Sequence, residues 1–145
     1  MAERHIILDN SVNSRLLWPD TETPANNSYA LKVIRQAVEG IVLHVPTIWH
    51  YEAAQVACNL TKMKRITQAD AYNYFSQLAL LPIVTDTLSH ANVSARTYEL
   101  GVQYGLSVYD GAYLELALRL GGELATNDVL LAKSAQRAGV PLFPR

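Results

Sequence analysis

Short apolar runs alternate along this chain with longer stretches in which apolar residues recur every three or four positions. The short runs suit strands that are buried on both faces, and the longer stretches suit helices with one apolar side. Parallel strands need long crossover connections, and helices commonly supply them. The pattern therefore predicts an α/β fold in which helices cover a mainly parallel sheet.

The pattern and the turn residues between its segments place the expected elements. We expect strands at His5–Leu8, Ile41–Val45, Ile83–Val84, Ser107–Tyr109, Glu123–Ala125 and Val140–Phe143. We expect helices at Ser28–Glu39, Thr47–Leu60, Gln68–Leu80, Ser89–Gln103, Asp110–Leu120 and Asp128–Ala138. Glycines follow several of these helices, where a left-handed residue often ends a helix, and Pro19–Asn27 is expected to be a surface loop.

Length and composition narrow the class of protein. A chain of 145 residues, half of them hydrophobic and 17% charged, suits one globular domain spanning residues 1–145. The formal charge of −1 gives no general attraction to nucleic acid, so any such contact must be local. The longest apolar stretch, Leu78–Val84, is too short to cross a membrane. Cys58 has no partner for a disulfide, and we expect it to be a small buried hydrophobe in a reducing cytoplasm.

Three acidic residues fall where expected strands end. Asp9 closes the first strand, Asp110 follows the fourth, and Asp128 follows the fifth. Ligands of open parallel sheets bind beyond the carboxyl ends of the strands. We therefore expect these three carboxylates to meet at one edge of the sheet.

Each of these acids also has a structural explanation. Asp9 and Asp110 could cap helices, and for either residue alone capping explains the position as well as catalysis does. Asp128 is expected in the first turn of its helix, where a carboxylate favours the helix dipole, with Thr126 or Asn127 as the cap.

A fourth acid, Glu52, lies inside an expected helix. The residues three or four positions away on the same helix face are apolar: Ile48, Trp49 and Val56. A carboxylate buried in an apolar stripe becomes neutral, forms an ion pair or binds a metal. A buried pair with Arg15 or Arg96 is the structural alternative.

Together the four carboxylates predict a metal site. Two carboxylates about 4 Å apart repel by roughly 4 kcal/mol at an effective dielectric constant near 20, so a pocket of four needs cations. Its ligands would all be oxygen atoms, because the sequence places no cysteine or clustered histidines with them. Such a ligand set suits Mg²⁺ or Mn²⁺ better than zinc.

Five motifs spread over nearly the whole chain carry a family resemblance. They are Leu8–Ser11, Pro46–Glu52, Leu81–Ile83, Tyr104–Ala117 and Leu124–Asp128. The most specific pieces are Tyr-Asp-x-x-Tyr-x-x-Leu-Ala at 109–117 and Thr-x-Asp at 126–128. With these motifs the chain resembles the PIN-domain ribonucleases, and within them the VapC-like toxins of toxin–antitoxin pairs.

The resemblance implies a PIN-like three-layer α/β/α sandwich with a central, mainly parallel sheet. It also implies a metal-dependent endoribonuclease in which Asp9, Glu52, Asp110 and Asp128 hold Mg²⁺ or Mn²⁺ and water attacks an RNA phosphodiester. Asp9, Glu52 and Asp110 are the expected direct ligands. Asp128 either binds the metal, directly or through water, or orients the attacking water.

The resemblance extends to further side chains and to partners. Three residues are expected to support the acids or contact substrate: Ser11, Thr126 and Asn127. Apart from the resemblance, Arg15, a turn or so beyond Asp9, is expected to contact a phosphate, because the loop geometry keeps it near the pocket. The chain departs from the family at Gln55, where Asn is common, and at Gly111, where Ala is usual and where glycine weakens a helix start by up to about 1 kcal/mol. The implied partners are RNA, a cognate antitoxin and a second copy of the chain.

Three other protein classes share part of this pattern. A receiver domain needs an acidic pair near the first strand and a lysine at a late strand end, and these are missing. A haloacid-dehalogenase-like phosphatase needs Asp-x-Asp after the first strand, where this chain has Asp9-Asn10-Ser11. A PIN-like module that binds RNA or protein without cleaving stays open as the alternative.

Overall fold

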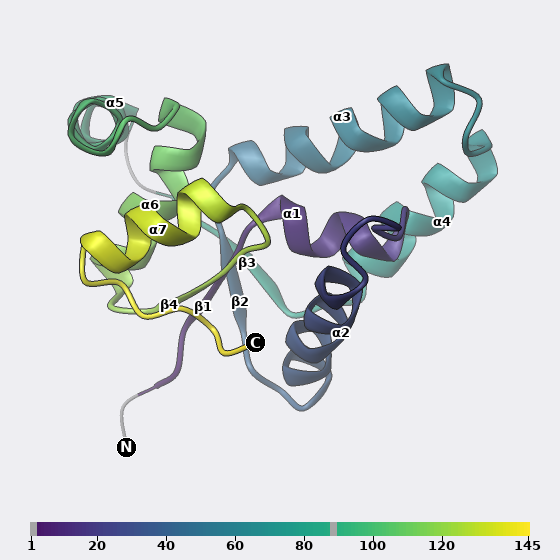
Figure 1. Cartoon of the computed structure of the whole chain (residues 1–145), viewed down its shortest axis with the longest axis horizontal. Coiled ribbons are helices and arrows are strands. Elements are labelled where there is room, and N and C mark those ends of the chain that lie inside the picture. The colour runs from purple at the N-terminus through teal and green to yellow at the C-terminus, as the bar shows by residue number, and fades with distance from the viewer. Residues whose placement is uncertain (1–2, 88–89) are drawn as a thin grey trace.

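A parallel sheet forms the centre of the structure, a computed structural model that describes residues 3–87 and 90–145. In that part of the chain the strands are β1 (Ile6–Leu8), β2 (Leu43–Val45), β3 (Ile83–Thr85) and β4 (Glu123–Ala125). Their order is β3-β2-β1-β4, and all neighbours are parallel (Figure 1). This arrangement confirms the predicted α/β class.

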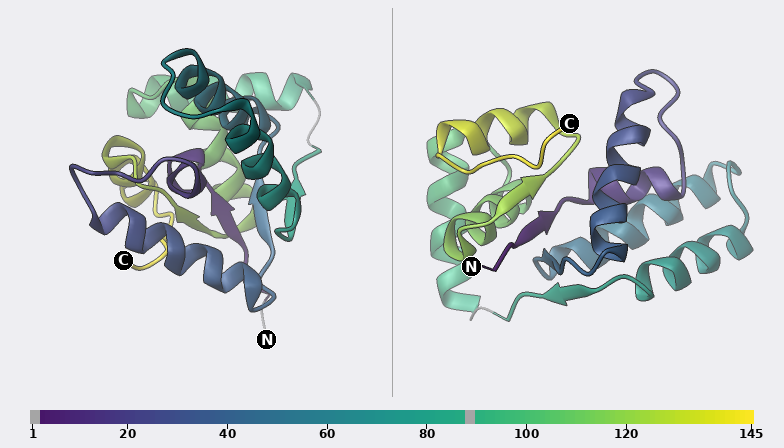
Figure 2. Two further views of the ribbon diagram at one scale, coloured as in Figure 1. Left: turned by 90° about the vertical axis from the view of Figure 1, so that its right-hand side faces the viewer. Right: turned by 90° about the horizontal axis from the view of Figure 1, so that it is seen from below.

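Helices flank the sheet on both sides. They are α1 (Asn10–Asn13), the 3₁₀ turn η1 (Ser14–Leu16), α2 (Ala25–Val38), α3 (Ile48–Lys62), α4 (Gln68–Ala79), α5 (His90–Tyr104), α6 (Val108–Leu120) and α7 (Val129–Arg137). Helices α5, α6 and α7 lie on one side of the strands and α1 to α4 on the other (Figures 1 and 2). Over residues 3–87 and 90–145, no helix has both the length and the apolar character needed to cross a membrane.

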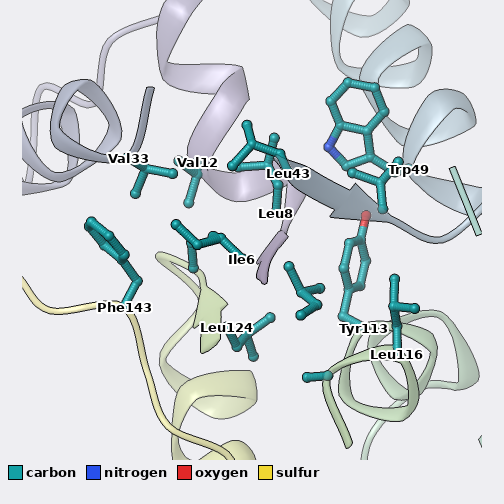
Figure 3. Packing of buried hydrophobic residues seen from close by; sticks show 14 of the residues in the cluster. Ile6, Leu8, Val12, Val33, Leu43, Trp49, Tyr113, Leu116, Leu124 and Phe143 are labelled. Carbon is teal, nitrogen blue, oxygen red and sulfur yellow. The ribbon is translucent and has the colours of Figure 1, made fainter. Parts of the chain in front are cut away.

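The core lies where these helices meet β1. All three residues of β1 are completely buried, because helices cover both faces of the strand. Figure 3 shows Val33 and Phe143 packed on one side of it, and Tyr113 and Leu116 of α6 on the other. A continuous apolar strand was expected on these grounds.

Most predicted helices are confirmed, with shifted ends. Helix α2 begins at Ala25, inside the segment Pro19–Asn27 that was expected to be a loop. The turn before the helix is fixed by Asp20, whose Oδ1 accepts hydrogen bonds from two backbone N–H groups, those of Glu22 and Thr23. Ser89, the expected first residue of the fifth helix, lies outside the described residues.

The predicted strand Ser107–Tyr109 is wrong. Ser107 is the N-cap of α6, and its Oγ accepts a hydrogen bond from the backbone N–H of Asp110 at 3.1 Å. Val108 and Tyr109 are the first helical residues, and both side chains are exposed. Gly105, with φ +65°, ends α5 in a left-handed turn that leads directly into α6.

The last predicted strand, Val140–Phe143, is reduced to a single bridge between Leu142 and Leu124. The N–H of Leu124 donates to Pro141 O, and the N–H of Phe143 donates to Leu124 O, both at 2.9 Å. Pro141 has no N–H of its own, so this edge cannot pair over a longer stretch.

The prediction that Cys58 is buried is also wrong. Its side chain is exposed on α3. The buried residues of this helix are Trp49, Ala53, Ala57 and Leu60. Cys58 follows Ala57 by one position, and this turns it about 100° around the helix and away from the core.

Candidate active site

The structure brings the four predicted acids into one electrostatic group. The charges of Asp110 and Asp128 raise the pKa of Asp9. The charges of Asp9 and Asp110 raise the pKa of Glu52. The charge of Asp128 raises the pKa of Asp110. These residues come from four different parts of the chain, and their carboxylates are close enough to repel one another. The charges of the four acids therefore act on one another, and their assignment as metal ligands stays a prediction.

Asp9 is the most deeply buried of the four, at 5% exposed. Its backbone N–H donates to Ala125 O at 3.0 Å, which ties the end of β1 to the end of β4. Its Oδ2 accepts hydrogen bonds from Ser11 Oγ at 2.5 Å and from Thr126 Oγ1 at 2.7 Å. Burial raises the pKa of Asp9 to about 6, against the opposing effect of the two hydroxyls. Asp9 occupies the N-cap position of α1 but makes no side-chain capping bond, so capping does not explain its carboxylate.

Glu52 lies half-buried on α3 and is held by Tyr113. The Tyr113 hydroxyl donates a hydrogen bond to Glu52 Oε1 at 2.5 Å. Tyr113 is completely buried and reaches from α6 across the core toward α3 (Figure 3). Burial is the largest cause of the raised pKa of Glu52, which the Tyr113 bond partly offsets. The partner is thus a tyrosine, and neither Arg15 nor Arg96 forms an ion pair with Glu52 in the described structure.

Asp110 lies in the first turn of α6, whose cap is Ser107. Burial, followed by the charge of Asp128, raises the pKa of Asp110. The next residue, Gly111, packs closely on α5: a Cβ there would lie 3.2 Å from Thr97 O. Gly111, where the family usually has alanine, therefore allows α5 and α6 to approach closely. This packing offsets the poor helix propensity of glycine.

Asp128 is itself the N-cap of α7, and no cap precedes it at Thr126 or Asn127. Its Oδ1 accepts a hydrogen bond from the N–H of Leu131 at 2.9 Å. Thr126 Oγ1 instead accepts from the N–H of Asp128 at 2.9 Å while it donates to Asp9. Asp128 thus has a structural role in addition to its place among the acids.

The supporting residues expected from the sequence surround Asp9, with one exception. Ser11 Oγ accepts from the N–H of Asn127 at 2.9 Å, and Asn127 Nδ2 donates to Ser11 O at 3.2 Å. Arg15 instead donates from Nη2 to Ser14 Oγ at 3.2 Å, and its charge acts on Asp20 and Tyr74. Among the described residues Arg15 forms no ion pair with any of the four acids.

Sequence reasoning missed the buried polar contacts beneath these acids. Asn13 is completely buried: its Nδ2 donates to Asn10 Oδ1 and to the Tyr74 hydroxyl, and its Oδ1 accepts from Trp49 Nε1, at 2.8 to 2.9 Å. These bonds tie α1, directly after Asp9, to α3 and α4. The sequence signal that could have indicated these contacts is the pair Asn10 and Asn13, three positions apart directly after a buried strand, because buried amides need hydrogen-bond partners.

The donor chemistry of the site fits a hard divalent cation. Oxygen atoms are the donors, and burial and mutual repulsion raise the pKa of Asp9, Glu52 and Asp110. A cation would compensate both effects. Over residues 3–87 and 90–145, no three acidic, His or Cys side chains converge closely enough to hold a metal as they stand. Three of the four carboxylates, those of Asp9, Glu52 and Asp128, each accept a hydrogen bond from a protein donor.

Comparison with known proteins gives one sequence relative. No protein-family model matches the chain. The chain is 27% identical to Ribonuclease VapC3 of Pyrobaculum aerophilum over 128 residues, which cover 88% of this chain and 92% of the relative. The alignment therefore spans nearly the full length of both proteins.

Two solved structures have a similar fold. PAE2754 from Pyrobaculum aerophilum matches with a TM-score of 0.66 at 19% identity, over 91% of this chain and 85% of the other. FitAcB from Neisseria gonorrhoeae matches with a TM-score of 0.53 at 18% identity, over 96% of both chains. Together with the sequence relative, these PIN-like folds confirm that the chain resembles the PIN-domain ribonucleases of the VapC type.

Proposed function

We propose that this protein is a metal-dependent endoribonuclease and the toxin of a toxin–antitoxin pair. Asp9, Glu52, Asp110 and Asp128 would hold Mg²⁺ or Mn²⁺. The observation that carries the proposal is the environment of Asp9, a buried carboxylate that two further acids approach without any basic partner among the described residues. Such an arrangement is unfavourable for folding and is typical of a site kept for its chemistry. The similarity to Ribonuclease VapC3 supports the choice of RNA.

The protein's own residues position the acids. Ser11 and Thr126 fix one oxygen of Asp9, and Tyr113 fixes one oxygen of Glu52. These bonds leave the second oxygen of each carboxylate available as a ligand. A divalent ion bound there would lower the pKa of an attacking water and neutralise charge on the phosphate. We assign no covalent step, because exposed Cys58 lies on α3 outside this group.

Cleavage assays test the proposal. Purified protein, separated from any bound partner, is incubated with RNA in Mg²⁺ or Mn²⁺ beside Asp9→Asn, Glu52→Gln and a chelator control. Glu39→Gln is a matched variant, because Glu39 is exposed at the end of α2. We expect cleavage by the parent and Glu39→Gln only. Cleavage that survives chelator or Asp9→Asn would contradict the metal mechanism. RNA binding without cleavage of any RNA would favour the non-cleaving PIN-like module.

An antitoxin and a second copy of the chain are the proposed protein partners. Similarity to a VapC ribonuclease supports the antitoxin. Its test is to search for a small reading frame directly upstream of the gene and, where one is found, to co-express the two chains, which should yield a stable complex and suppress cleavage. The self-association surface that we propose joins α5 and α6, where four large apolar side chains are exposed: Tyr98, Val102, Val108 and Tyr109. Exposed apolar patches of this kind commonly mark interfaces.

A further inference from the structure

Two histidines meet at the end of β1 opposite Asp9. His5 directly precedes β1, and His44 lies in the neighbouring strand β2. His5 Nδ1 lies 3.0 Å from His44 Nε2, with one ring as donor and the other as acceptor. The ring centroids are 4.8 Å apart, and the ring planes cross at 74°. Both rings are partly buried, so the contact is not a chance meeting of two freely moving surface side chains.

The distance between the two nitrogens matches that of neighbouring ligands on a metal ion. Metal–imidazole bonds are about 2.0–2.1 Å long, so two nitrogens that subtend roughly 90–110° at the ion lie about 2.9–3.4 Å apart. The observed 3.0 Å falls in this range. For both nitrogens to become ligands, the donor ring moves its proton to its other nitrogen. Each ring also turns by roughly 35–45°, so that both lone pairs leave the line between the two nitrogens and point to one ion beside it. The pair loses no proton in this change.

The backbone beneath the pair is held by the sheet. Ile7 of β1 pairs with His44 in the register of the two parallel strands. On the other side of β1, Gly122 packs against His5: a Cβ at Gly122 would lie 2.9 Å from His5 O and 3.2 Å from His5 Cβ. Two ligands on a fixed backbone lose little conformational freedom on binding, which favours affinity.

The charges around the pair favour a cation. Burial, and then the neighbouring His5, lower the pKa of His44, whereas the carboxylates of Glu3 and Asp86 act in the opposite direction. The charges of both carboxylates therefore act at His44. Asp86 is bound by Arg119 at 2.6 Å, and Glu3 is exposed. Glu3 or water would complete the coordination.

We propose that His5 and His44 form a second metal site, for divalent ions that prefer imidazole, such as Cu²⁺, Ni²⁺ and Zn²⁺. Imidazole nitrogen selects these ions, whereas carboxylate oxygen selects Mg²⁺ and Mn²⁺. Asp9 follows His5 by four residues of extended chain, roughly 13 Å at about 3.3 Å per residue, so the two sites can be filled separately. The inference does not depend on the proposed nuclease activity.

Calorimetric titration of the full chain with Ni²⁺ in excess Mg²⁺ tests the site. We expect one saturable binding event that is lost in His44→Gln and in His5→Gln. It should survive in Asp9→Asn, which separates it from the acids. His50→Gln is the matched control, because exposed His50 contacts Thr85 Oγ1 at 2.8 Å instead of a second histidine. No saturable binding by the parent, or binding that survives both of the first two variants, would overturn the proposal.

A second measurement needs no variant and therefore does not depend on folding of the mutants. Substoichiometric Cu²⁺ or Ni²⁺ broadens NMR signals of nuclei near its binding site. We expect the ring signals of His5 and His44 to broaden before those of His50, with Cu²⁺ bound more tightly than Ni²⁺. Earlier broadening at His50 or at the four acids would contradict the site.

Discussion

Tyr113 is the residue through which the core positions Glu52. Removing its hydroxyl in Tyr113→Phe takes away the hydrogen bond to Glu52 and leaves the packed ring in place. We expect cleavage to fall roughly 10–100-fold and to need more Mg²⁺, as is usual when a residue that orients a metal ligand is lost. Cleavage under single-turnover conditions over a Mg²⁺ series measures this effect.

Tyr74→Phe is the control for that variant. Tyr74 is also buried, and its hydroxyl is bonded to Asn13 at 2.8 Å and not to an acid. Both substitutions remove one buried hydrogen bond and should lower the free energy of unfolding by about 1 kcal/mol. Tyr113→Phe should change the Mg²⁺ dependence much more than Tyr74→Phe, because the Tyr74 hydroxyl reaches the site only through Asn13 and α1. An equal change in both variants would mean that Tyr113 acts through general stability.

The raised pKa of Asp9 predicts a pH-dependent cost in stability. The folded-state pKa is about 6, above the ordinary value of 3.8, so between these values the folded state binds the proton more tightly. Stability should fall as pH rises through this window, and above it the buried charge costs up to about 3 kcal/mol. Asp9→Asn should therefore be more stable than the parent at pH 7.5 in chelator, with the difference vanishing near pH 4. Thermal unfolding across this pH range measures it.

Asp20→Asn should show the opposite sign. Hydrogen bonds from the backbone of Thr23 and from Asn26 are the main causes of the lowered pKa of Asp20. The ionised form of Asp20 is therefore favoured in the folded state. Its loss in Asp20→Asn should destabilise the protein at neutral pH and matter less in acid.

The outcome that would contradict the Asp9 prediction is an Asp9→Asn variant that is no more stable than the parent at pH 7.5. In that case the buried charge of Asp9 would carry no cost in stability.

The burial of Glu52 could be predicted from its apolar helical neighbours, but its partner could not. Tyr113 lies 61 residues further along the chain. Local periodicity shows which face of a helix is covered and does not show which residue covers it. The same limit applies to Arg15: its hydrogen bond to Ser14 could not be read from its closeness in sequence to Asp9, and its contact with a phosphate stays a prediction.

At the scale of elements, the start of α6 links helix capping to the site. Ser107→Ala removes the hydrogen bond to the N–H of Asp110 and should lower the free energy of unfolding by about 1 kcal/mol. Thr67→Ala is the matched change, because Thr67 caps α4 through the N–H of Asp70. We expect similar losses in chemical denaturation and reduced cleavage only in Ser107→Ala. Equal cleavage in both variants would show that the cap does not position Asp110.

The elements with strong periodicity could be predicted from sequence, and the error at Ser107–Tyr109 shows why others could not. Serine, valine and tyrosine in succession suit a strand by local preference, and two of them have high β-propensity. The Gly105 turn and the Ser107 cap make the segment a helix start. Asp110 still joins the other acids, because the close approach of α5 and α6 at Gly111 positions it there.

At the scale of the whole molecule, the sheet order explains how distant acids meet. β1 and β4 are neighbours in the sheet, so Asp9 after one strand and Asp128 after the other come together. Glu52 reaches the group from α3, which follows β2 on the other side of β1. The alternation of short apolar runs and helices was enough to predict a parallel sheet with helical crossover connections. It could not give the order of the strands, which depends on packing between distant segments.

The exposed apolar side chains of α5 and α6 predict a dimer. Tyr98 and Val102 are four residues apart on one side of α5, at 66% and 69% exposed, and Val108 and Tyr109 of the neighbouring helix α6 are exposed as well. We expect sedimentation of the parent at twice the 16.1 kDa of one chain. Tyr98→Glu should yield monomers, because burying an unpaired carboxylate in an apolar interface is costly.

Leu80→Glu is the control for the dimer, because Leu80 is equally apolar and 85% exposed at the end of α4. It introduces the same charge outside the proposed interface and should leave the dimer intact. Circular dichroism should show that both variants keep the parent's helix content. A parent that sediments as a monomer would contradict self-association, and a dimer that survives Tyr98→Glu but not Leu80→Glu would move the interface to α4. Because the acids lie at the starts of α1, α6 and α7 and on α3, loss of the dimer through Tyr98 should leave metal binding by each chain unchanged.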